Sequence, residues 1–386
     1  MSSMLENPIP QDQYSIQEFI RVPLDPSKSL ISSRGLCGLA NLGNTCFMNS
    51  ILQCIAHTPQ LLEYFFTNKF QADIDISKRE RDLVGQLNQL CRCIWYRNAI
   101  VSPKVLLHTI HTLAAKKNNG QFQGYSQNDS QEFLQFILEC THEGLAQEVN
   151  VNITGEPRNE LDRLAIQAYT TFRNFFQNEH SLIVDTFYGM FKTTVLTQTK
   201  VLKEQGNKPV SRVTFDPFNM LSLEIPLENG VTDDGFTIYD CLDHFTKTEV
   251  LETKTADEYK VKRLSFWSLP DVLVVFFKRF NNMGRKINVP ITFNLNNLDF
   301  SKYMSGYNRK SYKYSVYGVV NHTGGTGGGH YYAYVKHLDN QWYCFNDQSV
   351  SVIEEKNVCS PNAYCLFLKK NKDQGTHGSL SNPPSN

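Results

Sequence analysis

The apolar pattern of the chain changes once, near residue 180, and this change restricts the fold more than any other feature. Before it, apolar residues recur at helical spacing, as in Ile51, Leu52 and Ile55. After it, short runs rich in aromatic and β-branched residues alternate with turn formers. The expected strands are residues 221–227, 272–280, 312–321, 330–337, 342–345 and 364–368. A helical half followed by a stranded half predicts an α+β fold, in which an antiparallel sheet lies beside a helical lobe with a cleft between them.

The composition argues against several classes of protein. Hydrophobic residues make up 41% and the formal net charge is zero, so we expect no general attraction to nucleic acid or to acidic membranes. Residues 1–20 lack the pattern of a signal peptide, and no apolar run approaches the roughly 18 residues of a spanning helix. We therefore expect a monomer in the cytosol or nucleus, with reduced thiols and no membrane or nucleic-acid partner.

The two ends of the chain differ in texture from its middle. Residues 1–34 are polar and proline-spotted and are interpreted as an N-terminal extension, whereas residues 371–386 are rich in Ser, Asn, Pro and Gly and are expected to be a disordered tail. The folded domain is then residues 35–370, helical to about 180 and stranded from about 181 onward.

A loop rich in Gly and Asn runs directly into a helix at Cys46. A thiol at this junction faces the unpaired amides and the positive end of the helix, which favour the thiolate and would lower its pKa. The same amides can stabilise the negative oxygen that forms when a carbonyl is attacked, and Asn41 could add a side-chain donor. The alternative is that Cys46 is a small core residue, which is the interpretation we adopt for Cys37 and Cys54.

A nucleophilic thiol needs a base, and the base needs an orienting partner. Of the ten histidines, His330 follows a glycine run and opens a strand, so a bound chain can approach it closely. The next strand ends at Asn346 and Asp347, either of which could hold the imidazole ring. The alternative for His330 is a strand-edge residue bonded to the backbone. His322 and His337 flank strands, where we expect wetter surroundings.

Three stretches make the sequence resemble the ubiquitin-specific proteases, a family of deubiquitinating enzymes. They are residues 38–50 around Cys46, residues 127–134 around Asp129, and residues 329–334 with 342–347, which contain His330 and Asn346. Weaker agreement lies in residues 215–218 with 221–226, and in residues 264–270 with 278–280. The stretches occur in family order and span about residues 35–370, which leaves little room for chance.

The resemblance implies a papain-like fold with a helical thumb, an antiparallel β palm and β fingers. Ubiquitin and ubiquitinated proteins would be the partners, and the reaction would be thiol-dependent hydrolysis of the peptide or isopeptide bond at the C-terminal glycine of ubiquitin. It also implies roles for the residues that match the family's motifs. These are Cys46 as nucleophile, His330 as general base, Asn346 or Asp347 as its orienting residue, Asn41 as oxyanion donor, and Asp129, Glu132 and Tyr331 as contacts of the ubiquitin tail.

All three of these tail contacts also have simpler interpretations. Asp129 and Glu132 have the spacing of a helix cap, and Tyr331 could be an ordinary strand residue packed on the core.

One departure from the family concerns a metal site. Many members carry two C-x-x-C pairs in the fingers, whereas residues 193–214 and 248–262 contain no cysteine. We therefore expect no metal and no cofactor, and fingers held by strand pairing and apolar contacts.

Two other functions remain open at this stage. The chain could be a catalytically idle adaptor that binds ubiquitin, or a peptidase for a ubiquitin-like modifier. The presence of Cys46, His330 and Asn346 together favours catalysis over the adaptor. Only the substrate contacts distinguish ubiquitin from its relatives.

Overall fold

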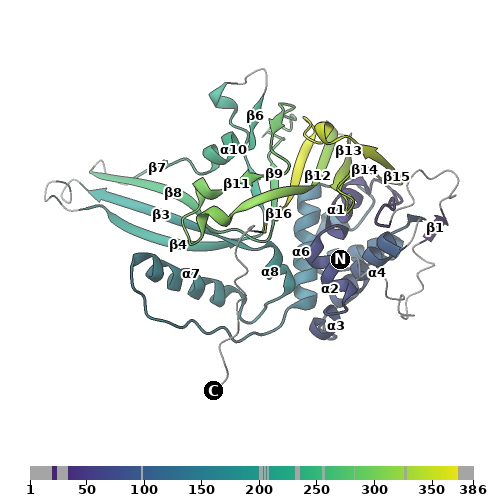
Figure 1. Ribbon diagram of the computed structural model, residues 1–386, viewed down its shortest axis with the longest axis horizontal. Helices are drawn as coiled ribbons and strands as arrows, with labels where there is room; N and C mark the ends of the chain where they lie inside the picture. Colours follow the sequence, from purple (N-terminus) through teal and green to yellow (C-terminus); the bar gives the residue numbers. More distant parts are fainter. Residues whose placement is uncertain are drawn as a thin grey trace.

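The computed structural model describes residues 20–23, 34–96, 99–199, 203, 206, 208–230, 235–253, 257–281, 283–325 and 328–372. Helices gather on one side, a large sheet lies beside them, and a second sheet projects away from both (Figure 1). These three parts correspond to the predicted thumb, palm and fingers, and the α+β class is confirmed.

The helices are α1 (Cys46–Ala56), α2 (Pro59–Phe66), α3 (Phe70–Asp73), α4 (Arg81–Tyr96), α5 (Lys104–Lys116), α6 (Ser130–Leu145), α7 (Glu160–Phe176), α8 (Leu182–Phe187) and α10 (Ile238–Phe245). Every residue of α1 is buried, so this helix forms the centre of the thumb instead of one of its outer walls. Thr58 precedes α2 and Pro59 begins it, a position where the missing amide of proline costs nothing.

The strands are β1 (Ile20–Pro23), β2 (Ala99–Val101), β3 (Gly189–Thr199), β4 (Val210–Phe218), β5 (Leu221–Leu223), β6 (Phe236–Thr237), β7 (Glu249–Leu251), β8 (Glu258–Ser268), β9 (Val272–Phe277), β10 (Ile291–Thr292), β11 (Leu298–Asp299), β12 (Lys313–Gly325), β13 (Gly328–Lys336), β14 (Trp342–Asn346), β15 (Ser349–Ile353) and β16 (Ala363–Lys370).

The palm is an eight-stranded sheet in the order β15-β14-β13-β12-β16-β9-β5, with β11 beside β12. All six residues of β9 are buried because one hydrophobic core lies on each face of the sheet. Val274 and Phe276 join the core shared with the thumb, whereas Leu273 and Val275 join the core on the opposite face. The palm is antiparallel except where β5 runs parallel to β9.

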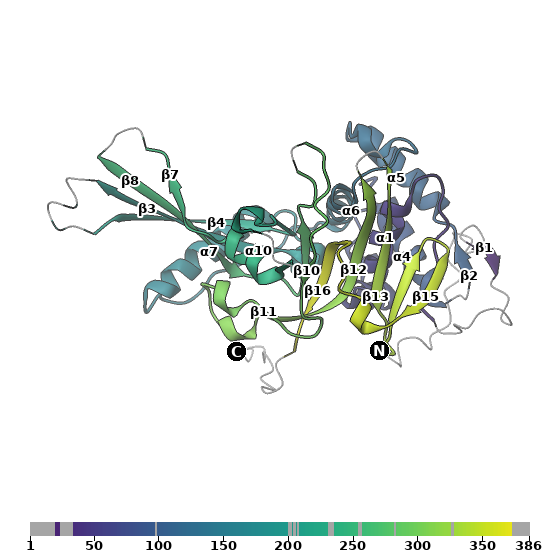
Figure 2. The same cartoon turned by 90° about the horizontal axis from the view of Figure 1, so that it is seen from above.

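The fingers are a four-stranded antiparallel sheet in the order β4-β3-β8-β7. Seen from above, the strands extend away from the palm and thumb as a narrow ribbon (Figure 2). β3 pairs with β4 from Gly189 to Thr197 on one edge and with β8 from Met190 to Thr199 on the other. As expected, strand pairing holds this sheet. Most side chains of β3 are only partly buried, so its apolar pattern was too weak for the sequence to predict it.

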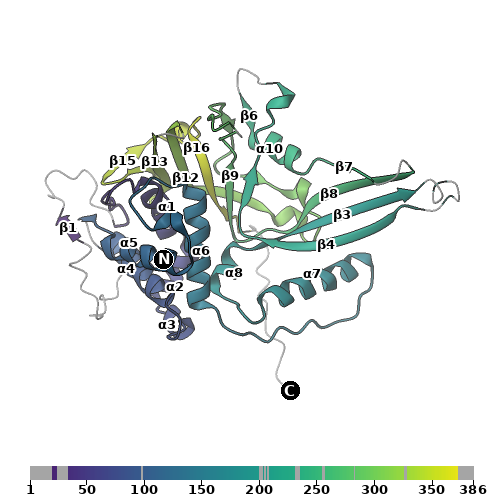
Figure 3. The same ribbon diagram turned by 180° about the vertical axis from the view of Figure 1, so that it is seen from behind.

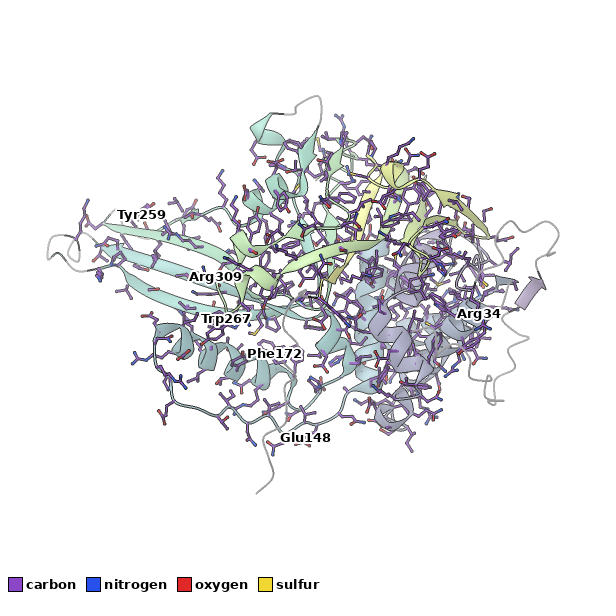
Figure 4. The ribbon with its side chains drawn as sticks, viewed as in Figure 1. Arg34, Glu148, Phe172, Tyr259, Trp267 and Arg309 are labelled. Atoms are coloured by element: carbon purple, nitrogen blue, oxygen red, sulfur yellow. The ribbon has the colours of Figure 1, made fainter. Side chains whose placement is uncertain are left out.

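Helix α7 lies along one face of the fingers (Figure 3). Ala165 and Ala168 of α7 pack with Met190, Phe215 and Trp267 of the sheet in a small separate core. Figure 4 labels Trp267 on the sheet and Phe172 on the helix, which also packs against this core. Apolar contacts therefore join strand pairing in holding the fingers, as predicted.

Several sequence-based boundaries shift. The expected strand at 221–227 ends at Leu223. Part of the turn expected at 324–329 is strand, because β12 extends to Gly325 and β13 begins at Gly328; residues 326–327 lie outside the described residues. Within the N-terminal extension, residues 20–23 form β1 and pair with β2; residues 1–19 and 24–33 lie outside the described residues, as does the tail from residue 373. Among described helices, none has the length and apolar character needed to cross a membrane.

Candidate active site

Cys46 is the first residue of α1, and the side chain of Asn41 shapes the loop before it. Asn41 Oδ1 accepts hydrogen bonds from the backbone amides of Gly43 and Thr45, at 3.0 and 3.2 Å. Gly43 has a φ of +108°, in the left-handed region that favours glycine. The Gly and Asn content of this loop therefore reflects a tight turn that brings the Cys46 thiol to the start of the helix.

The surroundings of Cys46 correct the predicted direction of its pKa. Burial raises the pKa of the thiol, and backbone amides of Tyr331, Phe47 and Cys46 oppose this effect, with the charge of Asp347 raising the pKa further. The helix-start amides act in the predicted direction, but burial is the larger effect because the Cys46 side chain is only 3% exposed. The net pKa is raised, so the thiol needs a base to ionise it near neutral pH.

His330 lies on β13, which packs against α1. The imidazole Nε2 and Asn346 Oδ1 are 2.6 Å apart. An amide oxygen can only accept, so Nε2 carries the hydrogen and the neutral ring keeps its lone pair on Nδ1. Tyr331, the next residue on β13, contributes its backbone amide to the Cys46 sulfur. The cysteine and the histidine segment thus meet in the fold.

Asp347 contacts the cysteine loop instead of His330. Its Oδ2 accepts a 2.9 Å hydrogen bond from Asn41 Nδ2, and its Oδ1 accepts a 2.8 Å bond from Asn49 Nδ2. Its backbone carbonyl accepts a further 2.8 Å bond from the amide of Leu39. Asp347 has a φ of +49°, which turns the chain between β14 and β15. Of the two candidates left open by the sequence, Asn346 is the one bonded to the imidazole.

The loop before Cys46 and the β14–β15 turn approach each other closely at Gly38, which explains why this position is a glycine. An added Cβ at Gly38 would lie 2.2 Å from the backbone oxygen of Gln348, far inside van der Waals contact. The backbone of residue 38 must therefore touch the β14–β15 turn for Asp347 to reach Asn41.

Asp129 is the N-cap of α6, as the simpler interpretation held. Its Oδ1 accepts from the backbone amides of Gln131 and Glu132, at 2.6 and 3.4 Å. Its Oδ2 accepts from the hydroxyls of Tyr364 and Tyr331, at 2.6 and 3.3 Å. Burial is the main reason that the pKa values of both tyrosines are raised, so both donate as neutral phenols. Asp129 thus ties the thumb helix to two palm strands.

Tyr331 and Glu132 differ in exposure. The Tyr331 side chain is 4% exposed and belongs to the core between thumb and palm, as its simpler interpretation expected. Glu132 is exposed on the first turn of α6. In the described structure, therefore, the charge nearer to solvent at this helix start is that of Glu132.

Two residues near the site were not predicted. Gln127 bridges thumb and palm, because its Nε2 donates to the Gly329 carbonyl at 2.7 Å and its Oε1 accepts from the Gly329 amide at 3.3 Å. His322 was expected in wet surroundings, but it is 2% exposed and packs against the rings of Tyr331 and Tyr364. Burial lowers the pKa of His322 to about 4. His322 is part of β12 and pairs with Tyr331 of β13, and its burial has no signal in the local sequence.

Four other cysteines and His337 are buried. Cys37 and Cys54 are buried core residues, as interpreted from the sequence, and Cys91 and Cys93 are buried as well. His337 is 9% exposed and stacks on Trp95, so the expectation of wet surroundings was wrong for it too. Within the described residues, no group of His, Cys, Asp and Glu side chains is arranged to hold a metal ion.

The chain is similar in sequence to ubiquitin hydrolases. A family model described as ubiquitin carboxyl-terminal hydrolase matches residues 37–368. Ubiquitin carboxyl-terminal hydrolase 2 of Bos taurus is 34% identical over 377 residues, which cover 92% of this chain and 56% of the relative. Ubiquitin carboxyl-terminal hydrolase Usp2 of Drosophila melanogaster is 32% identical, with 88% of this chain and 35% of the relative covered. The chain thus spans about half or less of these two relatives.

Solved structures with a similar fold include a yeast deubiquitinating module. The SAGA Ubp8/Sgf11/Sus1/Sgf73 module bound to ubiquitin aldehyde matches with a TM-score of 0.64 at 27% identity, over 89% of this chain and 71% of that chain. The module bound to monoubiquitin, with a substituted Ubp8, has a TM-score of 0.64 at 26% identity, over 90% and 72% of the two chains.

Proposed function

This chain belongs to the ubiquitin carboxyl-terminal hydrolase family, and from that premise we propose that it is a cysteine-type deubiquitinase. Its substrate is a protein joined through a peptide or isopeptide bond to the C-terminal glycine of ubiquitin. The observation that carries the proposal is the meeting of a cysteine at the start of a helix with the segment of an Asn346-bonded histidine, two groups that the chain separates widely.

In the proposed first step, Cys46 attacks the glycine carbonyl. His330 Nδ1 takes the proton from the thiol, which is needed because burial raises the pKa of Cys46. The 2.6 Å contact with Asn346 holds the ring with Nδ1 free. The C–N bond then breaks, the imidazolium gives its proton to the departing amine, and an acyl-enzyme remains on Cys46. Water, activated by the same imidazole, releases ubiquitin.

The negative oxygen of the intermediate is stabilised by two kinds of donor. One is the backbone amide at the start of α1, and the other is the Asn41 side chain. An amide nitrogen carries two hydrogens, and one Asn41 Nδ2 hydrogen already goes to Asp347 at 2.9 Å. The other is available to the oxyanion. Asp347 is therefore a positioning residue that aims Asn41, and Asn346 is the residue that orients His330.

Ubiquitin binds with its tail in the cleft between thumb and palm and its globular part against the palm and fingers. The exposed carboxylate of Glu132 attracts the basic tail, whereas Asp129 contributes by holding Tyr331 and Tyr364 in place. A hollow of about 550 Å³ at the junction of palm and fingers, lined by Glu224, His244 and Lys278 among others, offers further polar contacts. We infer ubiquitinated proteins as partners, and we retain the proposal of a monomer in the cytosol or nucleus.

The test is covalent capture with a ubiquitin probe that carries a C-terminal electrophile. We expect the chain of residues 1–386 to form one adduct, which mass spectrometry places on Cys46, and to cleave a fluorogenic ubiquitin amide. The Cys46→Ala variant should do neither. An adduct on Cys37 or Cys54 would show that another thiol is the nucleophile.

The same experiment separates the two alternative functions. Ubiquitin binding without turnover or capture would identify an idle adaptor. Faster capture by a probe made from a ubiquitin-like modifier than by the ubiquitin probe would identify a peptidase for that modifier. Equal folding of wild type and Cys46→Ala, checked by circular dichroism, makes the comparison valid.

A further inference from the structure

The proposed reaction places a requirement on the amine that leaves. After Cys46 gives its proton to His330 Nδ1, that same proton must pass to the lysine nitrogen as the C–N bond breaks. The lysine nitrogen therefore has to lie within hydrogen-bond reach of the imidazole. Its four methylene groups must then run along the protein surface next to His330, on the side away from the ubiquitin tail.

The thumb side of His330 is already occupied. Gln127 reaches from the thumb to Gly329, and Asp129 reaches to Tyr331. The proposed tail channel runs beside these contacts, between thumb and palm. The lysine consequently leaves in the other direction along β13, toward the residues that follow His330.

In that direction β13 presents a row of aromatic rings. Alternation along the strand puts Tyr331, Ala333 and Val335 in the core beside the thumb. Tyr332 and Tyr334 share the opposite face with His330 and are partly exposed. The His330 and Tyr332 rings are 6.4 Å apart between centroids and inclined by 23°, and the Tyr332 and Tyr334 rings are 5.4 Å apart and edge to face.

Tyr332 is held in this position from one side. Its hydroxyl accepts a hydrogen bond of 3.4 Å from Asn362 Nδ2, in the turn before β16. With the phenol tip anchored and the ring lying next to the imidazole, the Tyr332 ring offers a fixed apolar surface beside the catalytic base. An aliphatic lysine stem packs well on such a surface, while its nitrogen remains at the polar end.

We propose that Tyr332 is a specificity-determining residue that contacts the methylene groups of the lysine on the leaving side of the isopeptide bond. This inference rests on the proposed deubiquitinase function and extends it to the leaving group. Tyr332 acts during acylation only, because the lysine has departed before water attacks the acyl-enzyme.

Two ubiquitin substrates that share the acyl part and differ in the leaving group test the inference. One carries an isopeptide-linked lysine in a short peptide, and the other is ubiquitin ethyl ester, which has no lysine. We expect Tyr332→Ala to lower kcat/KM for the isopeptide about tenfold, the scale of losing apolar contact with a few methylene groups. The kcat/KM for the ester should stay at the wild-type value. Tyr332→Phe, which keeps the ring, should retain most of the isopeptide activity.

Tyr169→Ala is the matched control, because Tyr169 is 52% exposed on α7 and lies outside the proposed site; it should change neither rate. An equal loss on both substrates for Tyr332→Ala would overturn the inference, since the residue would then act on His330 or on folding. No loss on either would overturn it as well. A wild-type chain that cleaves neither substrate would instead contradict the proposed function itself.

Discussion

Asn346 and Asp347 are neighbours in the chain, yet their side chains bond to different parts of the site. Asn346 is bonded to the imidazole of His330, whereas Asp347 is bonded to Asn41 and Asn49. The left-handed backbone at Asp347, with a φ of +49°, is what sends the two side chains to different partners. Asn41 in turn lies 306 positions from Asp347 in the sequence. Their hydrogen bond therefore joins the loop before Cys46 to the turn after β14.

The different partners predict different defects. Asn346→Ala should lower kcat on the order of 10²-fold, because an unanchored imidazole is a poor general base. Asp347→Ala should also slow turnover, because Asn41 loses the carboxylate that positions it. It should in addition lower the pKa of Cys46, since the Asp347 carboxylate raises that pKa in the wild-type chain. The rate of Cys46 alkylation by iodoacetamide, followed against pH, measures this shift. A shift toward higher pH in Asp347→Ala would contradict the prediction.

A second prediction at this scale concerns Gly38. Gly38→Ala should displace the β14–β15 turn and reduce turnover, because its Cβ would overlap the Gln348 carbonyl. Gly85→Ala is the matched control, since no atom lies within 4 Å of the added Cβ and alanine favours the helix α4 there. A fluorogenic assay should show loss of activity in Gly38→Ala and not in Gly85→Ala. Thermal melting of both variants measures the accompanying change in stability. Equal activity of the two variants would argue against the close approach.

Among the elements, α7 has packing partners that are the hardest to predict from the sequence. It packs Ala165 and Ala168 against Phe215 and Trp267 of the fingers, and Gln167 Nε2 donates to the Val213 carbonyl at 3.0 Å. In the first turn of α7, Asp162 accepts a hydrogen bond from the hydroxyl of Tyr307, which lies in the segment between β11 and β12. The helix therefore connects one face of the fingers to the segment between β11 and β12.

This arrangement predicts that the small core under the fingers governs the grip on ubiquitin. Phe215→Ala should cost about 3–5 kcal/mol of unfolding free energy if the site cannot collapse. It should raise KM for ubiquitin substrates and leave hydrolysis of a short peptide with the ubiquitin tail sequence unchanged. Denaturant titration and the two kinetic assays measure these effects. A parallel loss on the tail peptide would show that the fingers and the cleft are not independent; Tyr169→Ala on the exposed side of α7 is the control.

On the scale of the whole molecule, two hydrophobic cores on opposite faces of the palm sheet join the three parts. Buried histidines lie in this interior. Burial lowers the pKa of both His57 and His322 to about 4. The unfolded chain would titrate these groups near 6.5, so between those values the unfolded state binds more protons than the folded state.

The folded chain should accordingly lose stability as the pH falls from about 6.5 toward 4. Each such histidine contributes up to about 1.4 kcal/mol per pH unit in that window. His322→Asn removes one of the two groups and should give a shallower slope of unfolding free energy against pH than wild type. Urea titrations at several pH values measure the slope. An unchanged slope in His322→Asn would mean that His322 is not neutral in the folded chain.

The sequence by itself determined the features that depend on near neighbours in the chain. The N-cap at Asp129 and the buried strands β9 and β16 follow from local propensity and apolar pattern. Cys46, His330, Asn346 and Asn41 could be selected because their residue types and motifs are local as well. Strands β3, β4 and β8 could not be predicted, since their half-buried faces leave a weak pattern.

Only the tertiary structure decided which partner each side chain meets. The bond of Asn346 to His330, the hold of Asp347 on Asn41, the burial of His322 and the packing of α7 under the fingers each join segments that are distant in the chain. The raised pKa of Cys46 has the same origin. A helix start lowers a thiol pKa through adjacent amides, but the opposing desolvation comes from burial in the core that thumb and palm share, which no local stretch of sequence encodes.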